Sequence, residues 1–171
     1  MFGRKLIAET PSTDPNFIIG RNVFTTLMDL TGNKNGYYMK LRFVVNSVEN
    51  KNAYTDFNGL ECIREYLTRF VRKRSDKIES VFYAETKDGF KLQINTLTIP
   101  LRKVDAGTKT QMRKLLVDYF ISEAEKSSIE QFVKNVLGEK YRTESRAMLN
   151  KIYPTKFHEV AKVEVIKRPG K

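Results

Sequence analysis

Three stretches of the sequence gather side chains suited to one kind of chemistry, the binding of anions. They run from Arg64 to Arg74, from Leu101 to Lys114 and from Lys162 to Lys171, and each is interleaved with apolar or aromatic residues that should anchor it to a core. Guanidinium groups bind phosphate through paired hydrogen bonds, and lysines act as point charges. One such stretch alone is typical of a solvated face, but three in a chain of net charge +11 favour contact with nucleic acid.

The overall charge leaves the class of polyanion open. The 171 residues include 31 Lys and Arg against 20 Asp and Glu. A surplus of this size repels itself unless an anionic partner offsets it. Nucleic acid is the favoured partner, and the alternative is a basic binding module for an acidic protein or an anionic membrane surface. Charge does not distinguish RNA from DNA.

Residues for catalysis or metal binding are scarce. His158 is the only histidine, and a zinc site needs further nitrogen or sulfur ligands, so we expect a surface or RNA-facing side chain. Cys62 is the only cysteine, and we expect it to be inert packing inside a helix, although nearby Arg64 keeps a reactive thiol open. The sequence contains no phosphate-binding glycine loop. We therefore predict no enzyme, no cofactor, no metal and no small-molecule substrate.

Aromatic side chains offer a second way to bind RNA, by stacking on bases. The candidates are Tyr37, Tyr38, Tyr54 and Tyr83. Strand aromatics are more often core residues or cross-strand partners, so the structural interpretation is preferred for them.

The location also follows from composition. A single cysteine cannot form an internal disulfide, which suits a reducing compartment. The apolar runs fall far short of the roughly 20 residues of a membrane-spanning helix. No signal peptide is recognisable after Arg4 and Lys5. We expect a cytosolic protein.

The pattern of apolar residues predicts one α+β domain over residues 1–171. Strands are expected at about 4–55 and 77–101, a helix at about 59–73, a helical block at about 107–153 and a final strand at about 156–168. Within the first region, Arg4 to Thr10 and Arg21 to Leu30 are strand candidates, and Asp88-Gly89 marks a hairpin in the second. In the helical block, the residues from Ser127 to Glu130 are typical of a capping box that opens a helix, and Gly138 closes that helix. We expect an antiparallel, barrel-like sheet with three to four packed helices.

Several segments, in this order and spacing, resemble the archaeal and eukaryotic small-subunit ribosomal protein family S3Ae, also called eS1. They are MFGRKLIAETP, LMDLTGN, KLRFVVNSV, TDFNGLECIREYLTRFVRKRSDKIE, TKDGFKLQINTLTIPLRK, QMRKLLVDYF and KIYPTKFHEVAKVEVIKRP, and they cover nearly the whole chain. Each segment alone is weak evidence for the family, but their order and spacing together are specific for it. The compact length resembles archaeal members. Family members usually carry a basic N-terminal extension before the segment that matches the start of this chain, so contacts of the tails with rRNA are not predicted.

The resemblance implies a structural, non-enzymatic constituent of the small ribosomal subunit. Such a protein sits on the platform and binds small-subunit rRNA, next to neighbouring ribosomal proteins and to mRNA near its exit. The RNA-binding positions that we carry onto this chain are the basic residues of the matching segments: Arg64, Arg69, Arg72, Lys73, Arg74, Arg102, Lys103, Arg113, Lys114, Lys167 and Arg168.

Overall fold

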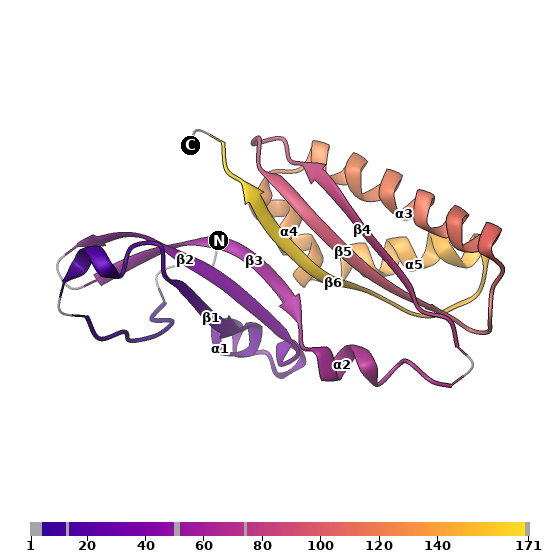
Figure 1. The fold of residues 1–171 in the computed structure, drawn as a ribbon, viewed down its shortest axis with the longest axis horizontal. Helices are drawn as coiled ribbons and strands as arrows, with labels where there is room; N and C mark the ends of the chain where they lie inside the picture. The colour runs from indigo at the N-terminus through magenta and orange to yellow at the C-terminus, as the bar shows by residue number, and fades with distance from the viewer. Residues whose placement is uncertain (1–4, 13, 50–51, 74, 170–171) are drawn as a thin grey trace. The chain divides into compact units, whose positions relative to one another are not determined.

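The computed structural model describes residues 5–12, 14–49, 52–73 and 75–169 of the chain. These residues form two compact units, Met1–Ile63 and Arg64–Lys171. Each unit combines antiparallel strands with at least one helix (Figure 1). The predicted α+β class is therefore confirmed.

The first unit is a three-stranded antiparallel sheet with short helices. Its elements are η1 (Pro15–Phe17), β1 (Asn22–Thr26), α1 (Leu27–Thr31), η2 (Lys34–Gly36), β2 (Met39–Glu49) and β3 (Asn52–Cys62). β2 lies between β1 and β3 and pairs with both. Buried side chains alternate along β2, where Leu41, Phe43 and Val45 face the core. This period of two is what a half-buried strand requires.

Two strand predictions in this unit are corrected. The strand expected over Arg21 to Leu30 ends at Thr26, because the Thr26 hydroxyl accepts the Asp29 amide and the Asp29 carboxylate accepts the Thr26 amide. This reciprocal capping box starts a helix. Residues 5–10 of the other candidate form no strand. That segment is held by side chains instead, since the ammonium group of Lys5 donates to the Leu30 carbonyl.

The helix predicted at 59–73 is much shorter, because its first residues belong to a strand. Leu60 pairs with Leu41, and Cys62 pairs with Met39, so β3 continues to Cys62. Helix α2 spans only Arg64–Thr68. The apolar residues of this stretch match a helical period and a strand period equally at its start, and pairing with β2 decides between them. Cys62 is therefore a buried strand residue and not a helical one.

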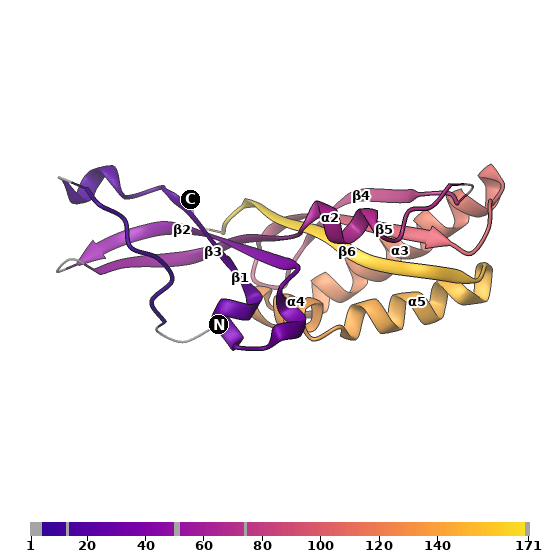
Figure 2. The ribbon, with the colours of Figure 1, turned by 90° about the horizontal axis from the view of Figure 1, so that it is seen from below.

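The second unit packs helices on one face of a three-stranded antiparallel sheet (Figures 1 and 2). Its other elements are β4 (Ile78–Glu85), β5 (Lys91–Pro100), α3 (Ala106–Lys126), α4 (Ile129–Leu137), α5 (Lys140–Ile152) and β6 (Thr155–Lys167). β5 lies between β4 and β6. The Phe82 ring contacts Phe120 of α3, which places the core between the sheet and the helices. In each unit the strands form an open sheet and not a closed barrel.

Turn and cap signals in this unit are confirmed. The Asp88-Gly89 turn joins β4 to β5, and Gly89 has a φ of 78°, in the left-handed region that glycine adopts without strain. The Ser128 hydroxyl accepts the Gln131 amide and caps α4. Gly138 follows the last residue of α4, as predicted.

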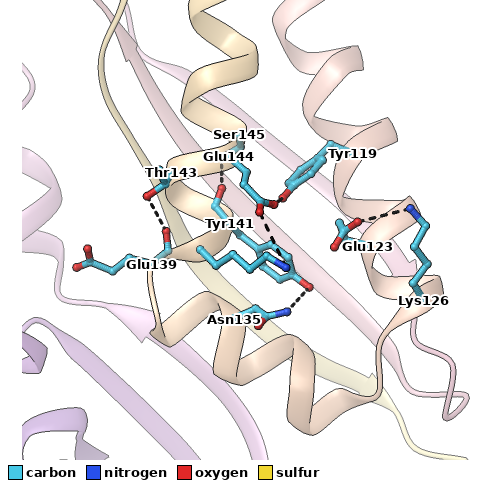
Figure 3. Close-up of polar contacts among 10 residues, drawn as sticks. Tyr119, Glu123, Lys126, Asn135, Glu139, Tyr141, Thr143, Glu144 and Ser145 are labelled. Atoms are coloured by element: carbon cyan, nitrogen blue, oxygen red, sulfur yellow. Dashed lines mark hydrogen bonds and ion pairs between the residues drawn. The ribbon is translucent and has the colours of Figure 1, made fainter.

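Tyr141 is the residue around which the three long helices pack. It is fully buried, and its ring contacts those of Phe120 and Phe132. The Asn135 amide donates to its hydroxyl at 3.1 Å (Figure 3). Beside it, the Tyr119 hydroxyl donates to the Glu144 carboxylate at 2.5 Å, and burial together with that carboxylate raises the pKa of Tyr119. These contacts join α3, α4 and α5 into one layer.

Replacing Tyr141 should therefore destabilise the second unit, and alanine should do so more than phenylalanine. Tyr141→Phe leaves the Asn135 amide without its acceptor and should lower the free energy of unfolding by about 1 kcal/mol. Tyr141→Ala also opens a cavity and should cost about 3 to 5 kcal/mol. Urea denaturation followed by circular dichroism measures both. Tyr83→Ala, at a residue 66% exposed, is the matched control and should stay within about 0.5 kcal/mol. Equal losses at the two positions would contradict this account of the core.

Candidate nucleic-acid interface

The first basic stretch is mounted on an aromatic anchor. Residues of α2 and of the turn after it pack against Leu97, Ile99 and Phe157 of the sheet; they are Tyr66, Leu67 and Phe70. The rings of Phe70 and Phe157 stack with centroids 3.8 Å apart. Arg64 and Arg69 are exposed on the same segment. Burial of the aromatic face thus leaves the arginines pointing to solvent.

The turn that follows holds two further cations in place. The Ser75 hydroxyl donates to the Arg72 carbonyl at 2.7 Å and accepts the Arg72 amide at 3.1 Å. The Ser75 amide also donates to the Arg72 carbonyl. These bonds close a tight turn in which Arg72 and Lys73 are exposed. Arg74, the next candidate, lies outside the described residues.

Asp76 ties this turn to the second basic stretch. Its carboxylate accepts the Val104 amide at 2.8 Å and forms an ion pair with Lys109 at 3.1 Å. The Val104 amide, followed by Lys109, holds the pKa of Asp76 below its usual range, and Lys103 adds to the same effect. The charged carboxylate therefore fastens the loop of Arg102 and Lys103, both exposed, beside the Arg72 turn.

The start of α3 belongs to the same end of the unit. The Asp105 carboxylate caps the helix by accepting the amide and the hydroxyl of Thr108. Two turns further along, the Arg113 guanidinium donates to the Glu79 carbonyl at the start of β4, and Lys114 is exposed. Figures 1 and 2 both show the end of β5 and the beginnings of β4 and α3 at one end of this unit.

We call this surface the cationic end. It is defined by seven of the predicted positions: Arg69, Arg72, Lys73, Arg102, Lys103, Arg113 and Lys114. The structure thus brings the first two basic stretches together. Arg64 lies at the first residue of α2, one turn and more before Arg69.

The third basic stretch lies elsewhere. Lys167 pairs with Lys91 at one end of β5, whereas Thr155 pairs with Pro100 at the other. The ten residues of β5 span roughly 30 Å. Lys167, which is exposed, and Arg168 are therefore separated from the cationic end by the length of the sheet.

Three cations of the cationic end differ from many other cations of the second unit in their partners. Many lysines and arginines of its strands and helices lie beside a carboxylate: Lys77 with Glu79, Lys91 with Glu85, Lys126 with Glu123, Lys134 with Glu130, Lys140 with Glu144, Arg142 with Glu139 and Glu159, and Lys162 with Glu164. In the part of the chain that the structure describes, Arg72, Lys73 and Arg102 form no ion pair with a carboxylate. Their charge is left for an external anion.

Sequence reasoning missed two cations near this end. The Leu101 amide donates to the Pro154 carbonyl, which brings the end of α5 and the start of β6 beside the second basic stretch. The Arg146 guanidinium bonds the carbonyls of Thr155 and Lys156, and Lys151 is exposed nearby. The signal that could have found them is the predicted final strand: an antiparallel final strand begins beside the end of β5, next to these residues.

His158 is buried, which corrects the prediction of a surface or RNA-facing side chain. It is 1% exposed, and its Nδ1 lies 2.8 Å from the Thr98 hydroxyl oxygen. Burial, then the charges of Arg146 and Arg142, lower its pKa to about 3. It therefore stays neutral at physiological pH and contributes to the core.

The other candidates for chemistry divide between buried and exposed positions. Cys62 is buried. Tyr38 is buried as well, whereas Tyr37, Tyr54 and Tyr83 are exposed. Among the described residues, no three His, Cys, Asp or Glu side chains are grouped to hold a metal ion. No described helix is long and apolar enough to cross a membrane.

Comparison with known proteins decides the family. The model of the Ribosomal S3Ae family matches residues 1–169. The chain belongs to this family. It is 34% identical to small ribosomal subunit protein eS1 of Sulfolobus acidocaldarius, over 99% of this chain and 86% of the relative. Identity to the eS1 protein of Methanothermobacter thermautotrophicus is 31%, over 99% of this chain and 87% of the relative.

The S3Ae assignment confirms the resemblance predicted from the sequence, including its archaeal character. The family is one of cytoplasmic ribosomal proteins without catalytic activity, so the predicted compartment and the prediction of no enzyme are confirmed too. The individual RNA-binding positions stay predictions.

The burial of His158 predicts a pH dependence of stability. Its pKa is near 3 in the folded protein and near the ordinary 6.5 in the unfolded chain, so below pH 6.5 only the unfolded chain takes up the proton. Stability should fall as the pH drops from 6.5 toward 3. Between pH 7 and pH 5 this loss should be about 2 kcal/mol.

His158→Asn removes the titration and can keep a bond to Thr98. Urea denaturation at pH 7 and pH 5 measures the loss of stability between the two pH values. This loss should be about 2 kcal/mol smaller in the variant than in the native chain. Glu159, whose pKa is raised by burial, is present in both proteins, so its effect cancels in the comparison. The same loss in both would show that His158 is not the titrating group.

Proposed function

We propose that this chain is a structural protein of the small ribosomal subunit and that its cationic end binds small-subunit rRNA. The observation that carries the proposal is the Asp76 carboxylate, which fastens the Arg72 turn and the Arg102 loop together. Exposed cations on two loops that are fastened to each other can contact several phosphates of a folded RNA together. The names of the archaeal relatives support the assignment to the small subunit.

Recognition of this kind reads the shape of folded RNA more than its base sequence. Arginine and lysine contacts to phosphates position a protein but carry no sequence information directly. The platform of the subunit, near the mRNA exit, is the location that we propose, with neighbouring ribosomal proteins and mRNA close by. Lys167 and Arg168 form a second, separate phosphate contact in this proposal, because the sheet holds them far from the cationic end.

Charge reversal tests the cationic end. The double variant Arg72→Glu and Lys73→Glu should weaken binding to a small-subunit rRNA fragment by roughly tenfold or more, since two phosphate contacts are lost and replaced by repulsion. Both residues are exposed, so the fold should be unaffected. Filter binding or fluorescence anisotropy measures the affinity.

The matched control changes the net charge by the same amount at lysines that already lie beside a carboxylate. Lys126→Glu with Lys134→Glu should leave rRNA affinity within a few fold, as these exposed residues belong to neither proposed phosphate contact and pair with Glu123 and Glu130. Equal losses in both variants would mean that net charge alone drives binding. That result would remove the site from the proposal.

The salt dependence measures the number of phosphates engaged. With about six contacts, log affinity should fall against log salt with a slope of roughly −4 to −5, at about 0.7 to 0.9 per contact. The Arg72 and Lys73 double variant should reduce that slope by about 2. Anionic lipid vesicles at equal ionic strength test the membrane alternative, which stands if they bind the protein as tightly as rRNA does. A slope near zero with rRNA contradicts the electrostatic account.

A further inference from the structure

The positive charge of the chain is concentrated in one unit. Residues 1–63 carry seven Lys and Arg against six Asp and Glu, a net charge of +1. Residues 64–171 carry 24 against 14, a net charge of +10. Binding of a polyanion is favoured by such a surplus, because released counterions supply a large share of the free energy. The first unit lacks this means of binding RNA.

The first unit exposes several large apolar side chains instead. Seven of the chain's large hydrophobic side chains that are exposed lie in it: Leu6 (83%), Phe17 (68%), Ile19 (50%), Phe24 (57%), Met28 (38%), Tyr37 (45%) and Tyr54 (42%). Single exposed apolar residues are ordinary on a protein surface. Seven of them in a nearly neutral unit of about 60 residues favour an apolar partner surface over phosphate, and the position of each decides whether it belongs to an interface.

Phe24 is the best defined of these residues, because a sheet fixes its position. It lies on β1 opposite Arg42 of β2, and paired residues in an antiparallel sheet share one face. The neighbouring pairs on that face are Lys40 with Glu61 and Val44 with Asp56. The opposite face carries the buried Leu41, Phe43 and Leu60. The core thus lies on one side of the sheet, and Phe24 lies on the other.

We call this side the outer face of the first unit; it consists of Phe24, Lys40, Arg42, Val44, Asp56 and Glu61. Its apolar residues are Phe24 and Val44, and its charges are two of each sign. Phosphates would meet repulsion from Asp56 and Glu61 as often as attraction from Lys40 and Arg42. A protein surface with an apolar centre and charges of both signs fits this pattern, as interfaces have an aromatic centre and a polar rim.

We propose that the outer face of the first unit binds a neighbouring protein of the small subunit, with Phe24 as its central apolar contact. The partner surface offers an apolar patch to Phe24 and Val44, an acidic group to Lys40 and a basic group to Glu61. This inference rests on the proposed function, because the partner belongs to the same particle. It assigns the two units different tasks: the second meets RNA and the first meets protein.

Photo-crosslinking in assembled particles tests the proposal and identifies the class of partner. The full-length chain carries p-benzoylphenylalanine in place of Phe24, is incorporated into small subunits, and is irradiated. A second chain carries the same group in place of Leu101, which is 59% exposed and adjacent to Arg102. The two substitutions are matched in chemistry and exposure. Nuclease and protease treatments then tell RNA adducts from protein adducts, and mass spectrometry names the protein.

At position 24 we expect one ribosomal protein as the adduct, resistant to nuclease and present at roughly tenfold higher yield than any RNA adduct. At position 101 we expect an RNA adduct. An RNA adduct at position 24, or no adduct there while position 101 reacts, overturns the inference and leaves the proposed function intact. Incorporation without an RNA adduct at position 101 overturns the RNA interface itself.

The single variant Phe24→Asp provides an independent reading. Loss of a central apolar contact should weaken binding to small-subunit particles that lack this protein by roughly tenfold or more. Binding to the naked rRNA fragment should not change. Equal affinity of variant and native chain for the particles contradicts the proposal, and a circular dichroism spectrum and melting curve check that the variant is folded.

Discussion

The carboxylate of Asp76 holds together two loops that lie 28 residues apart in the sequence, measured from Asp76 to Val104. Without an acceptor at this point the Val104 amide would have no described partner, and Lys109 would lose its ion pair. Unpaired backbone amides are costly in any partly buried position. The acceptor is charged at physiological pH, and the lowered pKa of Asp76 keeps it charged further into acid. One anion at the base of the surface thus orders the cations around it.

This arrangement explains why the cationic end needs a large apolar framework behind it. Phosphate recognition is strong only if the cations are already positioned, since ordering flexible lysines and arginines costs conformational entropy. The stacked rings of Phe70 and Phe157 position the Arg72 turn from one side. The helix layer centred on Tyr141 supports the sheet from its other face. Many other described cations of the unit have carboxylate partners, whereas Arg72, Lys73 and Arg102 have none among the described residues.

The sequence predicted the elements of the second unit well because each is marked by local chemistry. Asp88-Gly89, Ser128 and Gly138 act through their own turns and caps, and no distant residue is needed to interpret them. Leu60 and Cys62 show where this fails, as their apolar spacing fits a helix until β2 pairs with them. His158 fails for a related reason: alternation with charged neighbours predicts a half-exposed strand, whereas helices cover that face. The sequence also could not reveal that Asp76 joins two basic stretches, because Asp76 and Val104 meet only in the folded chain. That the third stretch lies at the far end of the sheet depends on the register of β5 and β6.

Coupling between the two loops of the cationic end is the most direct measurement of the central claim. It is obtained from rRNA affinities of Arg72→Ala, Arg102→Ala and the double variant, each in the native chain and in an Asp76→Ala chain. If Asp76 makes the loops one binding surface, the coupling free energy should exceed about 0.5 kcal/mol in the native chain and approach zero without Asp76. Additive effects in both chains, with rRNA affinity untouched by Asp76→Ala, would contradict the account.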